Sequence, residues 1–474
     1  MKQIPYFFVI IISLFITGNV YAQDFGFGFG FDDENTGSSG SPLAVSVGGR
    51  VSASMMGFLD DFEAGAEHIE LGDMFSGKLN FKAASSNAEG VINLNINASE
   101  TPVTIDEGYV RAFFGKFDIT AGLRKLTWGK ADSFGPLDVI NPLDTSAIYT
   151  EMADQTDLMG IKIARPMIHA SFRLGQFSKI EGVFIPWFEP HRFTTDGRWS
   201  VSQMDMLNNI PEYLPVELPV DPWFAQAKLN TTLPELFTAA SLDYAQAGLR
   251  FTTTIGSADV GIQYYYGWLP QPAVDINFVP PYMGEDGQLQ ANLSVAYKYN
   301  SYHQIGLDYA QVLFGFNVRA EAAANITEDL DGDDGSVYNP SIAWSFGFDR
   351  DLFWGINLNM QVTETIRLMH DKIGSNDIES IFAGDFDIEA GLPLTSTRLT
   401  AALSKKFFND ELEVRAAVVW GIEDNDCAVM PALIWTKDDI RIAFAGGFFA
   451  GDSDGQLGQY KDNHFLKVSI AYTF

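Results

Sequence analysis

The sequence predicts an all-β protein: a transmembrane antiparallel up-and-down β-barrel of roughly 16–18 strands with long extracellular loops. Three observations predict this fold. Apolar and polar residues alternate with a period of two over many segments, as in strands that face lipid on one side and a lumen on the other. Short turns and long excursions separate these segments. After Ile16, no apolar run approaches the roughly twenty residues that a transmembrane helix needs.

The first residues are typical of a secretory signal peptide. Lys2 gives a basic start, an apolar run extends from Phe7 to Ile16, and Val20-Tyr21-Ala22 places small residues where a signal peptidase reads. A transmembrane anchor is the alternative, but the apolar run is too short for a span. We therefore expect residues 1–22 to be cleaved and the mature chain to reach the outer membrane.

The next segment, residues 23–42, differs in composition from the rest of the chain. Phe and Gly alternate from Phe25 to Phe31, and a Gly/Ser stretch typical of a flexible linker follows. The Phe-Gly part either docks as a strand or plug, or forms a disordered periplasmic tail that contacts chaperones. We expect the barrel itself to occupy residues 43–474.

The final segment, residues 465–474, shows the alternation clearly. One parity is wholly apolar and consists of Leu466, Val468, Ile470, Tyr472 and Phe474. The segment resembles the C-terminal strand that the barrel-assembly machinery binds in outer-membrane barrels. The resemblance implies that Tyr472 and Phe474 form an assembly signal. The partners that we expect are this machinery, periplasmic chaperones and outer-membrane lipid.

The same alternation recurs upstream, where one face is apolar and the other carries charged or amide groups. It marks the segments 316–322, 356–367, 398–406, 411–420 and 440–448. A soluble sandwich also alternates. Helix-period stripes are nearly absent, however, and short turns such as 407–410 and 436–438 favour a meander over a Greek key.

The connections between the predicted strands are of unequal length. The long ones are 127–156, 189–241, 269–288 and 367–393. Barrels of this class have short periplasmic turns and longer extracellular loops, and the inequality fits that pattern. The Pro-rich excursion 189–241 is too long for a hairpin, so it either folds over or into the pore or carries a short helix.

The segment 107–144 carries the most specific pattern. It begins as a predicted hairpin whose lumen-facing residues are Glu107, Tyr109, Arg111, Asp118, Thr120 and Arg124. Trp128-Gly129, Asp132, Asp138, Asn141-Pro142 and Asp144 follow. This stretch resembles a family of long, porin-like outer-membrane barrels of bacteria, many of them of unknown function. That family's pattern is an inward Arg or Gln, then W-G-x-x-D, then D-x-x-N-P-x-D.

The resemblance implies a diffusion channel or a substrate-specific porin whose acidic loop lies against inward Arg residues. The resemblance is close over this stretch. In the rest of the chain, only the barrel pattern and Phe474 match the family. The Phe-Gly segment is not part of the family pattern, so its role stays open.

The residues themselves are compatible with this interpretation. Asp132, Asp138 and Asp144 are expected to pair with Arg111 and Arg124 and to hold the loop inside the lumen, or else to cap turns and face water. A field between the loop carboxylates and the lumenal Arg residues would then narrow the pore. Trp128 fits an interfacial girdle or a wedge under the loop. Asn141-Pro142 forces a turn, since a residue before proline avoids the α region.

Composition and motifs exclude several other functions. The net charge of −31 argues against nucleic acid as a partner. The single cysteine, Cys427, excludes an internal disulfide framework and a CxxC metal site. Asp329-x-Asp331-x-Asp333 begins like a calcium loop but lacks the Gly and Glu that such a loop requires, so no metal or other cofactor is expected. The six His residues lie in no recognisable nucleophile motif, so we do not expect an enzyme.

We therefore expect an outer-membrane channel for passive or selective diffusion of small solutes. The predicted pore-lining residues are Glu107, Arg111, Arg124, Asp132, Asp138, Asp144, Arg319, Glu321, Arg367, Arg398, Glu413, Arg415 and Arg441. One alternative is a transporter of hydrophobic substrates that resembles fatty-acid channels, with the Phe-Gly segment as a hatch. Another is a surface adhesin anchored by the barrel. The solute, the ion selectivity and the oligomeric state stay open.

Overall fold

The computed structural model describes residues 43–59, 69–70, 75–97, 102–145, 148, 151, 153, 158–194, 197–201, 217–219, 226–232, 241–285, 287–376, 380 and 383–474. The signal peptide and the Phe-Gly and Gly/Ser segment, which were predicted for residues 1–42, lie outside the described residues. Within the described part of the chain, no helix has the length and apolarity to cross a membrane.

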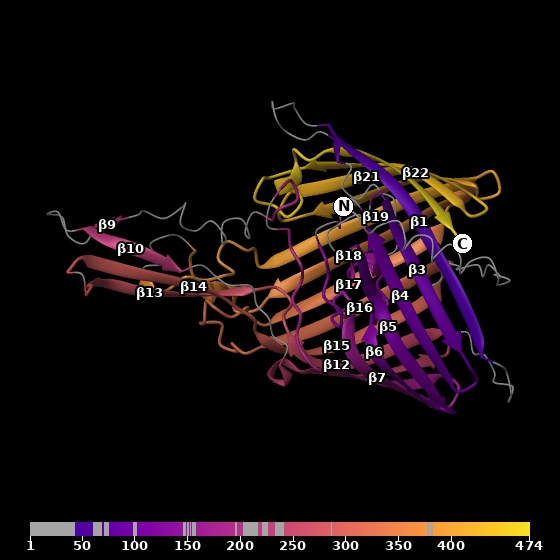
Figure 1. Ribbon diagram of the computed structural model, residues 1–474, viewed down its shortest axis with the longest axis horizontal. Coiled ribbons are helices and arrows are strands. Elements are labelled where there is room, and N and C mark those ends of the chain that lie inside the picture. Colours follow the sequence, from indigo (N-terminus) through magenta and orange to yellow (C-terminus); the bar gives the residue numbers. More distant parts are fainter. Residues whose placement is uncertain are drawn as a thin grey trace, which may run out of the picture.

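The described residues form a closed antiparallel barrel of 18 strands, whose arrangement Figure 1 shows. Its strands are β1 (Ala44–Phe58), β3 (Phe75–Ala84), β4 (Ala88–Asn97), β5 (Val103–Phe114), β6 (Phe117–Arg124), β7 (Arg165–Leu174), β8 (Ser178–Ile185), β11 (Gln246–Ile255), β12 (Ala258–Trp268), β15 (Ser301–Leu313), β16 (Phe316–Thr327), β17 (Ser341–Asp351), β18 (Ile356–Arg367), β19 (Thr395–Phe407), β20 (Leu412–Gly421), β21 (Asp426–Lys437), β22 (Ile440–Ala450) and β23 (Phe465–Thr473). Each strand pairs with the next, and β1 pairs with β23 to close the ring. A short strand, β2 (Ile69–Glu70), pairs with the end of β1.

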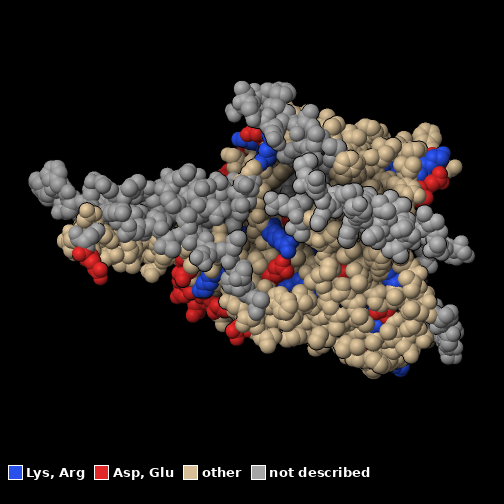
Figure 2. Space-filling view, in the orientation of Figure 1, with Lys and Arg blue, Asp and Glu red and all other residues tan. Residues whose placement is uncertain are grey.

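The two faces of the wall follow the alternation in the sequence. In β23, Leu466, Val468, Ile470 and Tyr472 are 38–50 % exposed, whereas the intervening side chains from Phe465 to Ala471 are buried. Successive side chains of a strand point to opposite faces, so the apolar parity lies outside and the other parity lines the lumen. The closed ring confirms the predicted fold class. These exposures confirm which side chains of β23 face outward. Charged residues are sparse on the tan outer wall that Figure 2 shows.

The two ends of the barrel differ. At one end, which we call the short-turn end, neighbouring strands join through brief turns such as 115–116, 256–257 and 438–439. Phe474 also lies there (Figure 1). The opposite end, the long-loop end, carries loop 3 (125–164), loop 4 (186–245), loop 5 (269–300), loop 7 (368–394) and loop 9 (451–464).

A second sheet of four strands projects from the long-loop end (Figure 1). Loop 5 forms the hairpin of β13 (Ala273–Met283) and β14 (Leu289–Lys298), and loop 4 contributes β9 (Glu217–Pro219) and β10 (Gln226–Thr232). The excursion 269–288, which was predicted as a loop, therefore includes a strand that pairs with 289–298. The β10 strand joins this hairpin through parallel pairing with β14.

The seam between β1 and β23 depends on Gly49. Its N–H donates to the carbonyl of Phe474, and the N–H of Phe474 donates back to Gly49, both at 2.9 Å. A Cβ at this position would lie 2.6 Å from the Lys78 carbonyl oxygen and 2.8 Å from the Phe474 ring. The aromatic ring of the last residue therefore lies where only a glycine leaves room.

We expect Gly49→Val to impair barrel closure, because the backbone of Lys78 cannot yield to the added side chain. The folded fraction after purification and the urea midpoint of unfolding should both fall. The matched control is Gly90→Val in β4, where an added Cβ meets nothing within 4 Å. If the two variants fold equally well, the proposed role of Gly49 in the seam is wrong.

Candidate functional site in the lumen

A belt of alternating charges follows the inner wall from β4 to β8. Arg111 lies 3.8 Å from Glu89 and 3.2 Å from Asp118 on the adjacent strands. His169 lies 3.3 Å from Glu181. A polar, charged inner wall is what a water-filled barrel requires.

The belt continues from β11 to β17. Arg250 pairs with Asp308 at 2.8 Å across β12, where Gly261 lacks the side chain that would collide with Asp308. Arg319 pairs with Asp349 at 2.6 Å. Opposite charges on neighbouring strands, or one strand apart, therefore neutralise one another along this part of the inner wall.

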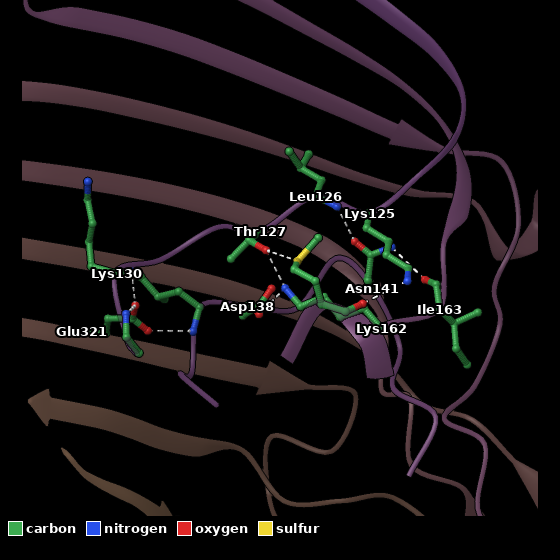
Figure 3. A network of polar contacts seen from close by, with 12 residues as sticks. Lys125, Leu126, Thr127, Lys130, Asp138, Asn141, Lys162, Ile163 and Glu321 are labelled. Atoms are coloured by element: carbon green, nitrogen blue, oxygen red, sulfur yellow. Dashed lines mark hydrogen bonds and ion pairs between the residues drawn. The ribbon is translucent and has the colours of Figure 1, made fainter. Parts of the chain in front are cut away.

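Loop 3 leaves β6 and lies against this wall, where Glu321 holds it (Figure 3). The Glu321 carboxylate accepts the backbone N–H groups of Lys130, of Ala131 at 2.7 Å and of Leu137 at 3.3 Å. Three N–H groups that converge on one carboxylate form an anion cradle of the kind that turns can build. The wall thus supplies the anion and the loop supplies the cradle.

Two glycines make this cradle possible. Gly129 has φ of +100°, a conformation that side chains disfavour, and its Cβ would lie 2.4 Å from the Glu321 carboxylate. A Cβ on Gly135 would lie 2.5 Å from both Ala131 Cβ and the same carboxylate. Gly129 of the W-G-x-x-D pattern is therefore needed for close approach of the loop to the wall.

Two apolar side chains wedge the loop further into the wall. Trp128 is 1 % exposed, and its ring occupies the space above Gly248 of β11. Leu137 is fully buried and fills the space above Gly306 of β15. Of the two roles considered for Trp128, the structure places it as a wedge under the loop and not in an outer girdle.

The base of loop 3 is clamped by Asn141 (Figure 3). Its Oδ1 accepts the N–H of Leu126 at 2.7 Å, and its Nδ2 donates to the carbonyls of Arg124 and Ile163 at 3.1 and 2.8 Å. Asn141 is 3 % exposed and lies in a bend before Pro142. The side chain therefore ties the two strands of the loop base together.

The predicted partners of the loop carboxylates were wrong. Asp132 pairs with Arg319 at 2.5 Å, Asp138 with Lys162 at 2.6 Å, and Asp144 lies 3.9 Å from Arg192. Arg111 and Arg124 are engaged elsewhere, because Arg111 pairs within the belt and Arg124 contacts His169 at 3.1 Å. The loop leans toward β16–β18, away from the strands that carry those two arginines.

Burial affects the protonation of the two inner loop carboxyl groups. It raises the pKa of Asp132 and of Asp138, although the charges of Arg319 and Lys162 act in the opposite direction. The ion pairs that hold loop 3 therefore weaken at a less acidic pH than exposed pairs would.

The remaining predicted pore residues have different environments. Glu107 accepts from Asn93 and from the N–H of Lys125, so it supports the loop base. Arg367 pairs with Glu389 of loop 7 at 3.2 Å, so it lies at the long-loop end. Arg398 donates to Gln456 of loop 9. Glu413 and Arg441 lie on the lumenal parity of β20 and β22.

Sequence reasoning missed an apolar stretch of the inner wall. Buried side chains there form one cluster that includes Val419, Ala428, Met430, Ala432, Ile434, Ala443, Ala445, Phe449 and Phe465. The signal for it was present in segment 427–435, where both parities are apolar. Loop 3 also reaches this wall, since Arg415 donates to the Ala153 carbonyl at 3.0 Å and Lys467 lies 3.8 Å from Glu151.

Loop 3 and loop 4 are joined by His191. Its Nδ1 accepts the N–H of Leu143 at 2.8 Å, and Arg192 forms a bridge with Asp144 beside it. Burial lowers the pKa of His191 to about 4. The neutral ring, which alone accepts this hydrogen bond, is therefore the form present in the folded protein above that pH.

Acid is expected to loosen this junction. The folded pKa lies below the unfolded value of about 6.5, so the unfolded state binds more protons between these values. The stability due to His191 is complete above pH ~6.5 and is lost as the pH falls through 4. Urea unfolding at pH 7.5 and 4.5 should show a smaller pH dependence in His191→Gln than in the unmodified protein. An equal dependence would contradict this role.

No protein-family model matches the chain, and no curated protein matches it. Among solved structures, Wzi of Escherichia coli, described as a carbohydrate-binding β-barrel involved in capsule assembly, has 10% identity and a TM-score of 0.44, covering 90% of this chain and 84% of Wzi. OccK9 of Pseudomonas aeruginosa has 8% identity and a TM-score of 0.48 over 91% and 97% of the two chains. The outer-membrane channel DcaP of Acinetobacter baumannii has 10% identity and a TM-score of 0.40 over 91% and 97%.

These similarities do not extend beyond the barrel architecture. The strand pairing of the chain itself establishes the closed antiparallel barrel, and its site must be interpreted from its own residues.

Proposed function

We propose that this protein is an outer-membrane channel through which small hydrophilic solutes diffuse. The observation that supports it most directly is the loop 3 assembly, in which Glu321 fixes a narrowing loop against a charged lumenal wall. A loop held rigidly within a barrel restricts the pore without closing it by motion. The apolar outer parity of strands such as β23 is suited to contact with lipid.

The selectivity of such a channel would depend on the balance of charges around loop 3. The side chains of Arg319 and Asp132 are partly exposed, and Asp349 lies beside them. Because these charges pair with one another, we expect weak ion selectivity at this wall. The orientation we propose places the long-loop end outside the cell and the short-turn end in the periplasm.

Planar-bilayer recording of the purified protein tests this function. We expect discrete conductance steps, together with uptake of small sugars or amino acids into liposomes. Heat-unfolded protein is the control. Absence of both conductance and solute uptake for folded protein would overturn the proposal.

A second candidate function is binding at the cell surface through the projecting sheet. It is favoured by the hairpin of β13 and β14, which extends beyond the barrel and has its own small core of Val274, Leu293 and Val295. Under this alternative the barrel acts as an anchor. Folded protein that inserts into liposomes but passes no solute would favour it.

A further inference from the structure

The indole of Trp199, in loop 4, lies among four aromatic rings at the long-loop end of the lumen. Its ring centroid is 6.2 Å from that of Phe58, 5.7 Å from Phe449, 5.4 Å from Tyr460 and 5.9 Å from Phe465. We call these four rings the aromatic seat. Phe58, Phe449 and Phe465 are on the inward parity of β1, β22 and β23, so the seat belongs to the lumenal wall.

A row of cationic and small side chains lies one step deeper in the lumen. Arg415 is paired in register with Ala432, Ala432 with Ala445, and Ala445 with Lys467. Lys467 is the next inward residue of β23 after Phe465, at a spacing of roughly 7 Å along the strand. Arg415 and Lys467 therefore lie on either side of Ala432 and Ala445, in a row next to the aromatic seat.

The protein's own loops occupy both parts of this surface. Loop 4 places an indole in the aromatic seat, and loop 3 places the Glu151 carboxylate 3.8 Å from Lys467. The Lys467 side chain is 10% exposed and the Glu151 side chain is 41% exposed, and their separation is near the upper limit for an ion pair, so Glu151 is the partner that another carboxylate can replace. In the folded protein, this part of the wall therefore contacts an aromatic ring, from Trp199, and a carboxylate, from Glu151.

We propose that this surface is a binding site for a solute that carries both an aromatic ring and a carboxylate. The ring takes the place of the Trp199 indole in the aromatic seat, and the carboxylate takes the place of Glu151 beside Lys467. Passage of this solute rests on the proposed channel function, whereas its binding does not depend on conduction.

The chemistry of the surface selects this class over others. Tilted and edge-on contacts with several rings favour a planar apolar group. The ammonium of Lys467 and the guanidinium of Arg415 favour a carboxylate and repel an amine. Met430, Ala432 and Ala445 extend the apolar surface below the seat, where an uncharged sugar would find few hydrogen-bonding partners.

Calorimetric titration of the purified full-length protein with phenylacetate tests the proposal. Trp199→Gly empties the aromatic seat, so this variant should bind phenylacetate about tenfold more tightly than the unmodified protein, in which the indole competes. Adding Lys467→Gln to it should weaken binding about tenfold, since the cation is lost. Phenethylamine, which has the ring and the opposite charge, should not bind the Trp199→Gly variant.

Matched controls separate the site from general effects. Trp354→Gly removes an indole that is 84% exposed at a short turn, so it should leave phenylacetate binding unchanged. Lys437→Gln removes a cation at the short-turn end and should also have no effect on it. Phe449→Ala removes one ring of the seat, so adding it to the Trp199→Gly variant should weaken phenylacetate binding.

Two results would overturn the proposal. One is equal phenylacetate affinity in the Trp199→Gly and Trp354→Gly variants. The other is equal binding of phenylacetate and phenethylamine. Binding as expected in a protein that conducts nothing would instead refute the channel function and leave this site standing.

Discussion

Glu321→Ala is expected to release loop 3 from the wall and to increase single-channel conductance. The substitution removes the acceptor of three backbone N–H groups in Lys130, Ala131 and Leu137. Hydrogen bonds to a charged group contribute about 1.5–3 kcal/mol each. Since each ~1.4 kcal/mol is a factor of ten, the loss of two such bonds at the lower value, about 3 kcal/mol, already raises the released population roughly 100-fold.

The increase must be separated from the effect of removing a negative charge. Glu413→Ala removes a carboxylate from the lumenal parity of β20, four strands along the ring from the cradle on β16, and should change conductance little. Gly135→Val should act like Glu321→Ala, because its side chain would collide with both Ala131 and the Glu321 carboxylate. Equal conductance of the Glu321→Ala and Glu413→Ala channels would show that Glu321 does not hold the loop.

The barrel could be predicted from the sequence because its main signal is local. Alternation within nine residues of β23 is enough to assign Leu466 and Lys467 to opposite faces. The position of loop 3 could be anticipated from its length and its acidic residues. These features depend on neighbours in the chain and on the period of a strand.

The contacts of the loop could not be predicted, because they join distant parts of the chain. Lys130 and Glu321 are 191 residues apart, and no local pattern marks Glu321 as different from other inward acids. Gly248 and Gly306 have no visible role until Trp128 and Leu137 are placed above them. The assignment of Arg111 and Arg124 to the loop failed for the same reason, since cross-strand neighbours were closer partners.

The apolar inner wall shows a limit of the alternation argument itself. In segment 427–435 both parities are apolar, so alternation does not indicate which of the two faces is lumenal. The structure resolves this, because Met430 and Ala432 face the lumen and are covered by residues of loops 3 and 4. An apolar lumenal face therefore indicates a surface that other groups cover, which is the basis of the proposed aromatic-acid site.

Arg250→Met is expected to cause the largest loss of stability among single substitutions in the belt. The side chains of Arg250 and Asp308 are 7% and 0% exposed, and Glu181 lies opposite Arg250 in the register of β8 and β11. Removing the cation leaves the buried Asp308 carboxylate uncompensated, which costs about 3–5 kcal/mol in comparable buried pairs. Urea unfolding in lipid vesicles should show this loss.

The size of this loss follows from burial, and two variants test that reasoning. Lys437→Met breaks a pair with Glu411 whose side chains are 52% and 38% exposed, so it should cost less than about 1 kcal/mol. Adding Asp308→Leu to Arg250→Met should recover part of the stability, since replacing both members of a buried pair is less costly than removing one. If Arg250→Met costs no more than Lys437→Met, then water reaches the Arg250–Asp308 pair. Loop 3 would in that case not seal this side of the lumen, and the pore would extend behind it.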